Sequence, residues 1–330
     1  MMAARIAVVG AGRMGEGIAL AFMHAGLPVT LIDIKAREPE QQRLYFAKVR
    51  AGLANELQTL VRLGVLEPGQ ADEALGRVRL CDRDQARGDL ACAELVFEAV
   101  PEVLEVKREC FAWLSGQCGA DCIIASTTST FLVTELAGLV SHPGRFVNAH
   151  WLNPAYLIPL VEVSRSAATD GAVVERLLAL LRRVGKVPVL CAPAAGYIVP
   201  RIQALAMNEA ARMVEEGVAS AEDIDTAIRV GFGLRFSVLG LLEFIDWGGG
   251  DILYYASRYL AGAIDPRFAS PQVIADNMHE GRNGLREGQG FYDYAGVDVE
   301  AYKLRRLGEF TRKLDLMGLA PRFNGALQEA

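Results

Sequence analysis

The chain up to about residue 190 alternates short apolar runs with longer segments whose apolar residues have helical spacing. The short runs are rich in Val and Ile, which is typical of strands buried on both faces of a parallel sheet. Strands are expected at residues 5–9, 29–32, 78–80, 95–97, 122–125, 146–148, 160–163 and 187–190. Helices are expected between them at residues 16–25, 39–63, 103–114 and 172–184. This alternation predicts an α/β fold, a doubly wound sheet with right-handed crossovers.

The pattern changes near residues 191–196, after which helical spacing dominates. Helices are expected at residues 201–218, 221–230 and 239–245. We therefore predict two domains, residues 1–192 with the sheet and an all-helical domain at residues 193–330.

Three polar segments follow expected strands, namely residues 98–102, 126–129 and 150–154. The carboxyl ends of the strands in such sheets face one crevice, where ligands bind. An active site is expected where these segments converge.

Composition narrows the class of protein. A chain of 330 residues with 52% hydrophobic residues can bury two cores. A formal charge of -6 and a pI near 5.4 argue against binding to nucleic acid or to an anionic membrane. No apolar run approaches the ~20 residues that cross a bilayer, and the N-terminus leads directly into a strand. We expect a soluble cytoplasmic protein.

The six cysteines form no CxxC pair and no paired metal-ligand spacing, so no metal site is expected. Most are interpreted as buried thiols of a reducing compartment. They are Cys81, Cys92, Cys110, Cys118, Cys122 and Cys191.

A glycine fingerprint lies between the first expected strand and helix, Gly10-Ala11-Gly12-Arg13-Met14-Gly15. Gly10 would make the tight turn, Gly12 would let a pyrophosphate approach the backbone, and Gly15 would let helix and strand pack closely. Arg13 and Met14 open the helix, whose free amides attract phosphate. Asp33 ends the next strand, where a carboxylate binds the adenosine ribose and repels a 2′-phosphate. The sequence predicts a Rossmann-type site for NAD.

A second constellation is Asn148-Ala149-His150-Trp151-Leu152-Asn153-Pro154, with Glu162 twelve residues after the histidine. Oxidation of an alcohol by a nicotinamide needs a group that takes the hydroxyl proton, and histidine has a suitable pKa. Glu162 could fix the tautomer of His150 if its strand returns beside it. The alternative is a buried histidine that serves packing alone.

Other polar residues have two interpretations. Ser129 could donate a hydrogen bond to the substrate oxygen, or Ser129 or Thr130 could cap a helix that starts near Leu132. Glu102 and Lys107 could contact the nicotinamide ribose, or form a surface pair of little consequence.

Several motifs occur in order along the chain, namely GAGRMG, EAVPEVLEVK, ASTTST, HWLNP followed by LVEV, NEAARMVEEGVASAEDIDTA and GLREGQGFYDY. Together they resemble the 3-hydroxyacyl-CoA dehydrogenase family over nearly the whole chain. The resemblance implies NAD-dependent oxidation of a 3-hydroxy group, with His150 as base and Glu162 as its orienting acid. It also implies substrate contacts from Ser129 and Asn153, cofactor contacts from Glu102 and Lys107, and a homodimer formed through the helical domain.

The chain departs from the family at Gly196-Tyr197-Ile198-Val199-Pro200-Arg201. The family commonly has GFIVNR, whose asparagine amide helps to bind the substrate oxygen. Proline lacks that donor, although the first turn of a helix tolerates it. Either Ser129 acts alone, or Gln203 replaces the missing amide.

Two features point to different substrates. Residues 231–240 resemble the gulonate and carnitine dehydrogenase branches, where Arg235 could clamp a free carboxylate or simply lie on a solvated turn. The GQGFYDY stretch looks more like the acyl-CoA enzymes, and cations expected on one helix could meet coenzyme A phosphates. These cations are Arg43, Lys48, Arg50 and Arg62.

Oxidation of a short 3-hydroxyacyl-CoA, a reaction of fatty acid metabolism, is the leading hypothesis. The alternative is a dehydrogenase of a free 3-hydroxy acid or related alcohol. A third hypothesis, of another class, is a crystallin-like protein that binds NAD(H) without turnover.

Overall fold

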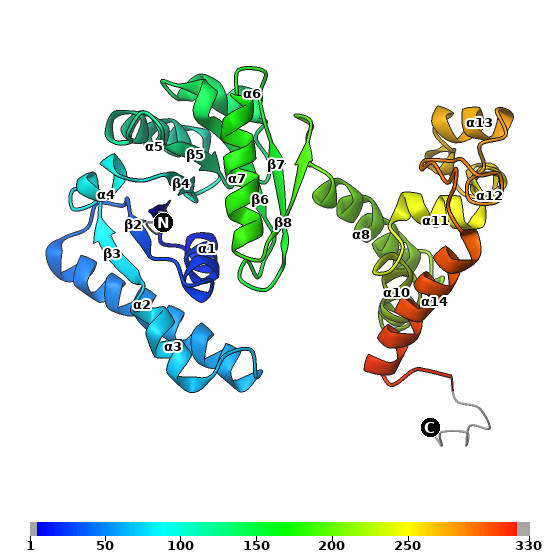
Figure 1. Ribbon diagram of the computed structural model, residues 1–330, viewed down its shortest axis with the longest axis horizontal. Helices are drawn as coiled ribbons and strands as arrows, with labels where there is room; N and C mark the ends of the chain where they lie inside the picture. The colour runs from blue at the N-terminus through cyan, green and yellow to red at the C-terminus, as the bar shows by residue number, and fades with distance from the viewer. Residues whose placement is uncertain (1–4, 322–330) are drawn as a thin grey trace. The chain divides into compact units, whose positions relative to one another are not determined.

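The computed structural model describes residues 5–321. The chain divides into two compact units, residues 1–207 and residues 208–330. The first unit contains a sheet with helices on both faces, and the second is helical (Figure 1). The predicted fold class is therefore confirmed, while the boundary at residues 192 and 193 stays a prediction.

Eight strands form one sheet in the order β3-β2-β1-β4-β5-β6-β7-β8. Neighbouring strands are parallel except β6 and β7, which are antiparallel. All eight were predicted, and their bounds are β1 Ile6–Val9, β2 Val29–Asp33, β3 Val78–Asp82, β4 Leu95–Glu98, β5 Ile123–Ser126, β6 Phe146–Trp151, β7 Leu160–Ser164 and β8 Val187–Cys191.

One strand end differs in a way that matters for function. The prediction ended a strand at residue 148 and placed His150 in the following loop, but β6 continues to Trp151. The reason is the antiparallel partner, because β7 pairs with β6 as far as Trp151. His150 therefore lies on a strand of the sheet, which fixes its backbone.

The helices of the first unit alternate with the strands. They are α1 Arg13–His24, α2 Pro39–Arg62, α3 Pro68–Leu75, α4 Arg87–Ala91, α5 Leu104–Gln117, α6 Val133–Leu136 and α7 Gly171–Arg183, and α8 Val199–Glu215 starts in this unit. The prediction missed α3 and α4, which are too short to show an apolar period, whereas α6 begins where a helix was expected, near Leu132. Local signals explain α3, since Pro68 opens it and the Gln70 side chain accepts the backbone N–H of Glu67 at 2.9 Å.

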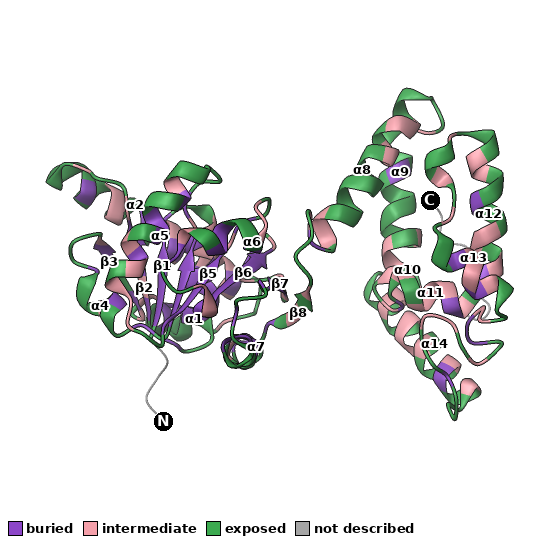
Figure 2. Ribbon diagram, turned by 90° about the horizontal axis from the view of Figure 1, so that it is seen from above, coloured by how far each residue is buried: buried purple, intermediate pink, exposed green. Residues whose placement is uncertain are grey.

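The core of this unit lies on both faces of the sheet, because successive strand residues point to opposite sides. In β1, Ile6 and Val8 belong to a buried cluster that includes residues of α1, α2 and α7. Ala7 and Val9 belong to a second cluster with residues of α4, α5 and α6. Figure 2 shows the buried residues concentrated on the strands.

The second unit contains the rest of α8 and helices that the prediction found only in part. They are α9 Ala221–Ala227, a π-helical stretch at Ile228–Gly233, α10 Leu234–Phe236, α11 Leu241–Gly248, α12 Gly250–Ala263, α13 Gln272–His279 and α14 Val299–Leu316. The last three were not predicted.

A buried carboxylate organises the end of this unit. Asp246, 2% exposed, accepts the backbone N–H groups of Phe291 and Tyr292, both at 2.9 Å, and the Tyr294 hydroxyl at 3.2 Å. A Cβ at Gly290 would lie 2.1 Å from an oxygen of Asp246. The GQGFYDY stretch therefore has a structural task, which is to wrap and satisfy this carboxylate.

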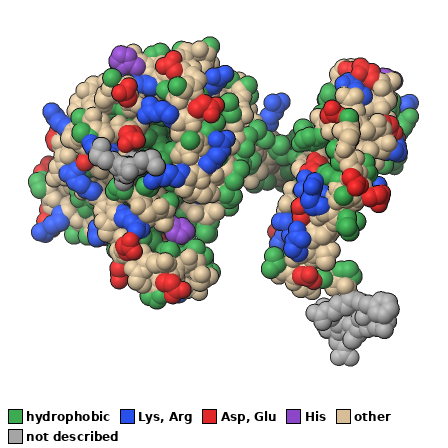
Figure 3. Space-filling model, in the orientation of Figure 1, with side chains coloured by type: hydrophobic (Ala, Val, Ile, Leu, Met, Phe, Trp, Pro, Cys, Tyr) green, Lys and Arg blue, Asp and Glu red, His purple; other side chains and the backbone are tan. Residues whose placement is uncertain are grey.

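Three of the six cysteines, Cys81, Cys110 and Cys122, are buried, whereas Cys92 is exposed and the other two are half-buried. The prediction that most are buried was too broad. Between residues 5 and 321 no helix combines the length and apolarity needed to span a bilayer. Basic and acidic side chains are interspersed over the sheet-containing unit on the face that Figure 3 shows.

Candidate active site

The register of β6 and β7 places Glu162 directly opposite His150. Directly opposed residues of antiparallel strands project to the same face of the sheet. The Nδ1 atom of His150 lies 2.9 Å from Oε2 of Glu162, with the carboxylate fully buried and the histidine side chain 7% exposed. The sequence left open whether the strand of Glu162 returns beside His150. The antiparallel pairing of β6 and β7 brings the two side chains together.

The other oxygen of Glu162 holds a different segment. Oε1 accepts the backbone N–H groups of Ile198 and Val199, at 2.9 and 2.8 Å, where α8 begins. A carboxylate at a helix N-terminus satisfies amides that have no partner within the helix. Glu162 is thus fixed at both oxygens.

Sequence reasoning missed Tyr197, which adjoins this pair. Its ring stacks on the His150 imidazole, with centroids 4.9 Å apart and an interplanar angle of 15°. Its hydroxyl donates to the Thr128 carbonyl at 2.9 Å and accepts the Asn148 side-chain amide at 3.1 Å. The available signal was a tyrosine at the phenylalanine position of the GFIVNR motif.

The backbone of Tyr197 is also unusual. Its φ is +45°, and no other non-glycine residue among 5–321 has a positive φ. A left-handed conformation costs an L-residue roughly 1–2 kcal/mol, so the contacts of the side chain must offset this strain.

The loop after β5 carries Ser129, whose side chain is exposed. The alternative that Ser129 or Thr130 caps a helix is wrong, because α6 begins after Leu132 without a side-chain cap. Instead the Thr128 hydroxyl accepts the N–H of Phe131 at 3.0 Å and donates to Glu102. The Thr128 side chain therefore fixes this loop, while Ser129 stays exposed.

Glu102 and Lys107 do not form a surface pair. Lys107 is fully buried, and its ammonium lies 2.9 Å from Glu98 and 3.2 Å from Glu102. Burial raises the pKa of Glu102, but the hydrogen bond from Thr128 and the Lys107 charge outweigh it and lower the pKa overall. Because Lys107 has no exposed atom, we interpret it as a support for Glu102, whose side chain is one-third exposed.

The glycine fingerprint fits a dinucleotide. Gly10 has a φ of +108°, and a Cβ there would lie 2.4 Å from the Ala99 carbonyl oxygen. A Cβ at Gly15 would lie 1.9 Å from the Gly10 oxygen, whereas one at Gly12 would have no neighbour within 4 Å. The turn is thus closed where strand and helix pack, and open at Gly12. There α1 begins with exposed Arg13 and half-buried Met14.

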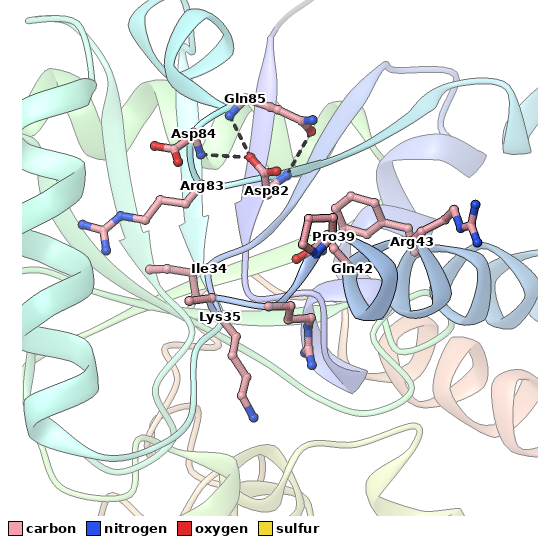
Figure 4. A pocket seen from close by; sticks show the side chains of 12 residues that line it. Ile34, Lys35, Pro39, Gln42, Arg43, Asp82, Arg83, Asp84 and Gln85 are labelled. Atoms are coloured by element: carbon pink, nitrogen blue, oxygen red, sulfur yellow. Dashed lines mark hydrogen bonds between the residues drawn. The ribbon is translucent and has the colours of Figure 1, made fainter.

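Asp33 lies at the end of β2, beside a cavity of about 580 Å³. Its carboxylate accepts the side chains of Arg37 at 2.7 Å and Gln42 at 3.1 Å. Figure 4 shows the cavity between the loop after β2, the start of α2 and the loop after β3. Arg37 also stacks over Tyr45, whose hydroxyl donates to the Ala11 carbonyl in the glycine turn at 2.6 Å. Asp33 at the end of β2 is therefore linked to the glycine turn through Arg37 and Tyr45.

The remaining predicted substrate residues have fewer contacts. Asn153 precedes a cis peptide bond to Pro154, is exposed and lines a cavity of about 390 Å³. Pro200 lies in the first turn of α8 as expected, and Gln203 is exposed on the same helix. Arg235 belongs to the second unit, where its guanidinium lies 5.7 Å from the centre of the Phe244 ring.

Fold and site define an NAD-dependent dehydrogenase with a dinucleotide-binding sheet and a helical second part. Residues 5–194 match the NAD binding domain of 3-hydroxyacyl-CoA dehydrogenase, and residues 196–294 match the C-terminal domain of the same family. The chain belongs to the 3-hydroxyacyl-CoA dehydrogenase family.

Relatives in this family carry different substrate names. The chain is 30% identical over 308 residues to 5-formyl-3-hydroxy-2-methylpyridine 4-carboxylate 5-dehydrogenase of Mesorhizobium japonicum, covering 92% of this chain and 95% of the relative. It is 32% identical to 3-hydroxybutyryl-CoA dehydrogenase of Bradyrhizobium diazoefficiens, covering 89% and 96%. The solved 3-hydroxyacyl-CoA dehydrogenase of Archaeoglobus fulgidus superposes with a TM-score of 0.73 at 30% identity, covering 95% and 99%. The chain is thus an oxidoreductase that uses NAD, and the family alone does not determine its substrate.

Proposed function

We propose that this protein oxidises a hydroxyl group with NAD, using His150 as general base and Glu162 as its orienting acid. The observation that carries the proposal is the 2.9 Å contact between these side chains. It lies in a sheet whose glycine turn fits the cofactor.

The cofactor, when bound, supplies the hydride acceptor. Because Nδ1 of His150 faces Glu162, that nitrogen carries the hydrogen and Nε2 is left to accept the hydroxyl proton. The buried carboxylate then stabilises the imidazolium that forms. The alcohol would lose its proton to Nε2, and a bound NAD would supply the acceptor for its hydride, so charge and electrons balance.

The Ser129 hydroxyl is the donor that we assign to the substrate oxygen, with Asn153 as a second contact. Both side chains are exposed at the ends of neighbouring strands β5 and β6. Gln203 is our candidate for the amide that Pro200 removes. If a Gln203→Ala change leaves kcat/KM unaltered, Ser129 acts without it.

A short-chain 3-hydroxyacyl-CoA is the first candidate substrate. Relatives such as the Bradyrhizobium enzyme are named for this class. The cations proposed to meet coenzyme A phosphates all lie exposed on α2, namely Arg43, Lys48, Arg50 and Arg62. If this candidate holds, the protein acts in fatty acid metabolism.

A free hydroxy carboxylic acid is the second candidate, and two observations favour it. The Mesorhizobium relative is named for a substrate that is a carboxylate and not a thioester. Arg235 is exposed and has no carboxylate within ion-pair distance in the described part of the chain. The GQGFYDY stretch does not oppose this candidate, because its contacts with Asp246 explain it.

A substrate panel with Arg235→Ala separates the two candidates. Loss of a charge-assisted carboxylate contact should lower kcat/KM for a free hydroxy acid by roughly 10- to 100-fold. Turnover of 3-hydroxybutyryl-CoA should change less than about twofold, since a thioester has no carboxylate to lose. Arg229→Ala, an exposed arginine of the same unit, is the matched control. Equal losses on both substrates would remove Arg235 from substrate recognition.

The non-enzymatic alternative is set aside, because the chain matches the NAD binding domain of a dehydrogenase family and the Mesorhizobium and Bradyrhizobium relatives are named dehydrogenases. A homodimer through the helical unit and a cytoplasmic location remain predictions. The first is testable by sedimentation of the full chain.

A further inference from the structure

The turn between β8 and α8, residues 196–199, contacts both members of the His150–Glu162 pair. We propose that Tyr197 in this turn is a positioning residue, which fixes the plane of the imidazole and ties the loop of Ser129 to it. The proposal rests on the function proposed above, in which His150 accepts the hydroxyl proton.

The ring of Tyr197 restricts the rotation of His150. The two rings lie nearly parallel, 15° apart, and Tyr197 is 7% exposed, so surrounding atoms hold it in place. A flat partner on one face of the imidazole opposes rotation about the bond between Cβ and the ring. The ring is thereby kept in the plane in which Nδ1 lies 2.9 Å from Glu162.

The hydroxyl of Tyr197 bonds to strand β6 and to the loop after β5. It accepts from Asn148, two residues before His150 on β6, and donates to the carbonyl of Thr128, the residue before Ser129. Burial raises the pKa of the Tyr197 phenol, so the hydroxyl keeps its proton and remains a donor at neutral and mildly alkaline pH. Phenylalanine would keep the stack and lose both bonds.

The backbone of the same turn completes the arrangement. Immediately after Tyr197, Ile198 and Val199 donate their N–H groups to Glu162. One short segment therefore contacts His150 through the Tyr197 ring and Glu162 through two backbone amides. It also contacts the loop of Ser129 through the Tyr197 hydroxyl.

This arrangement has a catalytic consequence. Ser129 and His150 must meet the same substrate oxygen, one as donor and the other as proton acceptor. Ser129 lies in the loop after β5 and His150 lies on β6, so their separation depends on links between this loop and β6. The Tyr197 hydroxyl is such a link. A small displacement of reacting groups can cost about 100-fold in rate.

The test compares Tyr197→Phe and Tyr197→Leu in the full chain. We expect kcat to fall about 10-fold for phenylalanine and about 100-fold for leucine, with KM and the Kd of NADH within about twofold of the original. The aromatic variant thus restores part of the leucine loss. Tyr294→Phe is the matched control, because it also removes a hydroxyl from a buried tyrosine, here the bond to Asp246. Its kcat should not change.

Three results would overturn the proposal. If both Tyr197 variants keep kcat within twofold while His150→Gln abolishes turnover, Tyr197 only packs and the function stands. If Tyr197→Phe lowers kcat no more than Tyr294→Phe does at equal loss of Tm, the effect is general destabilisation. Retained turnover in His150→Gln would instead refute the proposed base, and the role of Tyr197 with it.

Discussion

Replacing Glu162 with glutamine would change the charge of this side chain while keeping its shape. The carboxylate is fully buried and accepts three hydrogen bonds, from His150 and from the N–H groups of Ile198 and Val199. Glutamine has one oxygen and one NH₂ group, so it cannot serve both sides as an acceptor.

The two backbone amides decide the orientation. Both N–H groups, at 2.9 and 2.8 Å, require an oxygen, so the NH₂ group would face Nδ1 of His150. That nitrogen must then accept, which moves the hydrogen of the ring to Nε2. A protonated Nε2 cannot take the hydroxyl proton of the substrate.

The expected loss follows from the value of the base. General-base assistance contributes about 10²–10⁴ in rate, and we expect kcat of Glu162→Gln to fall about 10³-fold. At 1.36 kcal/mol per tenfold change, this is a rise of about 4 kcal/mol in the barrier. The affinity for NADH should stay within about threefold, since Glu162 has no exposed surface to offer the cofactor.

The measurement is the rate of NADH formation at saturating NAD and substrate, with NADH affinity by fluorescence titration. Glu243→Gln is the control. Glu243 also forms an ion pair with a half-buried partner, Arg306, but it lies in the second unit. A Glu162→Gln protein that keeps a third or more of kcat would refute the orienting role.

Four other outcomes follow from the structure. Gly12→Ala should leave the free energy of unfolding unchanged yet weaken NADH binding at least about 10-fold, because the added methyl occupies the open side of the turn. Gly15→Ala should instead destabilise the fold by about 1–3 kcal/mol, since its methyl meets backbone, and equal denaturant midpoints for the pair would contradict this reasoning. Gly290→Ala should lower Tm through its clash with Asp246, and an unchanged melting curve would show that this carboxylate can move. Lys186 is buried, and its ammonium donates to the carbonyls of Ala155 and Ile158 at 2.6 and 2.9 Å. Burial lowers its pKa from 10.5 to about 8, so between pH 8 and pH 10.5 the unfolded chain binds more protons than the folded chain. Between pH 8 and pH 10.5 this residue should therefore raise the free energy of unfolding by up to about 1.4 kcal/mol per pH unit. This rise should vanish in Lys186→Met.

The sheet could be predicted because its information is local. Buried parallel strands have continuous apolar runs, and the glycine turn joins the first of them to a helix. The helical unit was harder, because α12 and α14 leave large apolar residues such as Ile252 and Leu304 exposed and so lack a clear buried face. Short helices such as α4 depend on contacts with the rest of the fold, which a sequence period does not report.

The candidate site divides in the same way. His150 and Glu162 are twelve residues apart, and a single antiparallel pairing brings them together, so the sequence could suggest the pair. Tyr197 stacks on a histidine 47 positions earlier in the chain, and no spacing rule predicts such a contact. The burial of Lys107 was equally hidden, because its partner Glu98 is the last residue of β4.

The two oxygens of Glu162 have a consequence for exchanging parts between relatives. One oxygen serves the histidine, while the other receives the first amides of α8, the helix that continues into the second unit. A chimera that joins this sheet to a foreign helical part at residue 192 would separate the histidine from the segment that immobilises it. Such a hybrid could still retain NAD, yet its chemistry would depend on whether the new helix happened to begin with the same turn. Grafts intended to alter substrate range should therefore be spliced within α8, downstream of Val199.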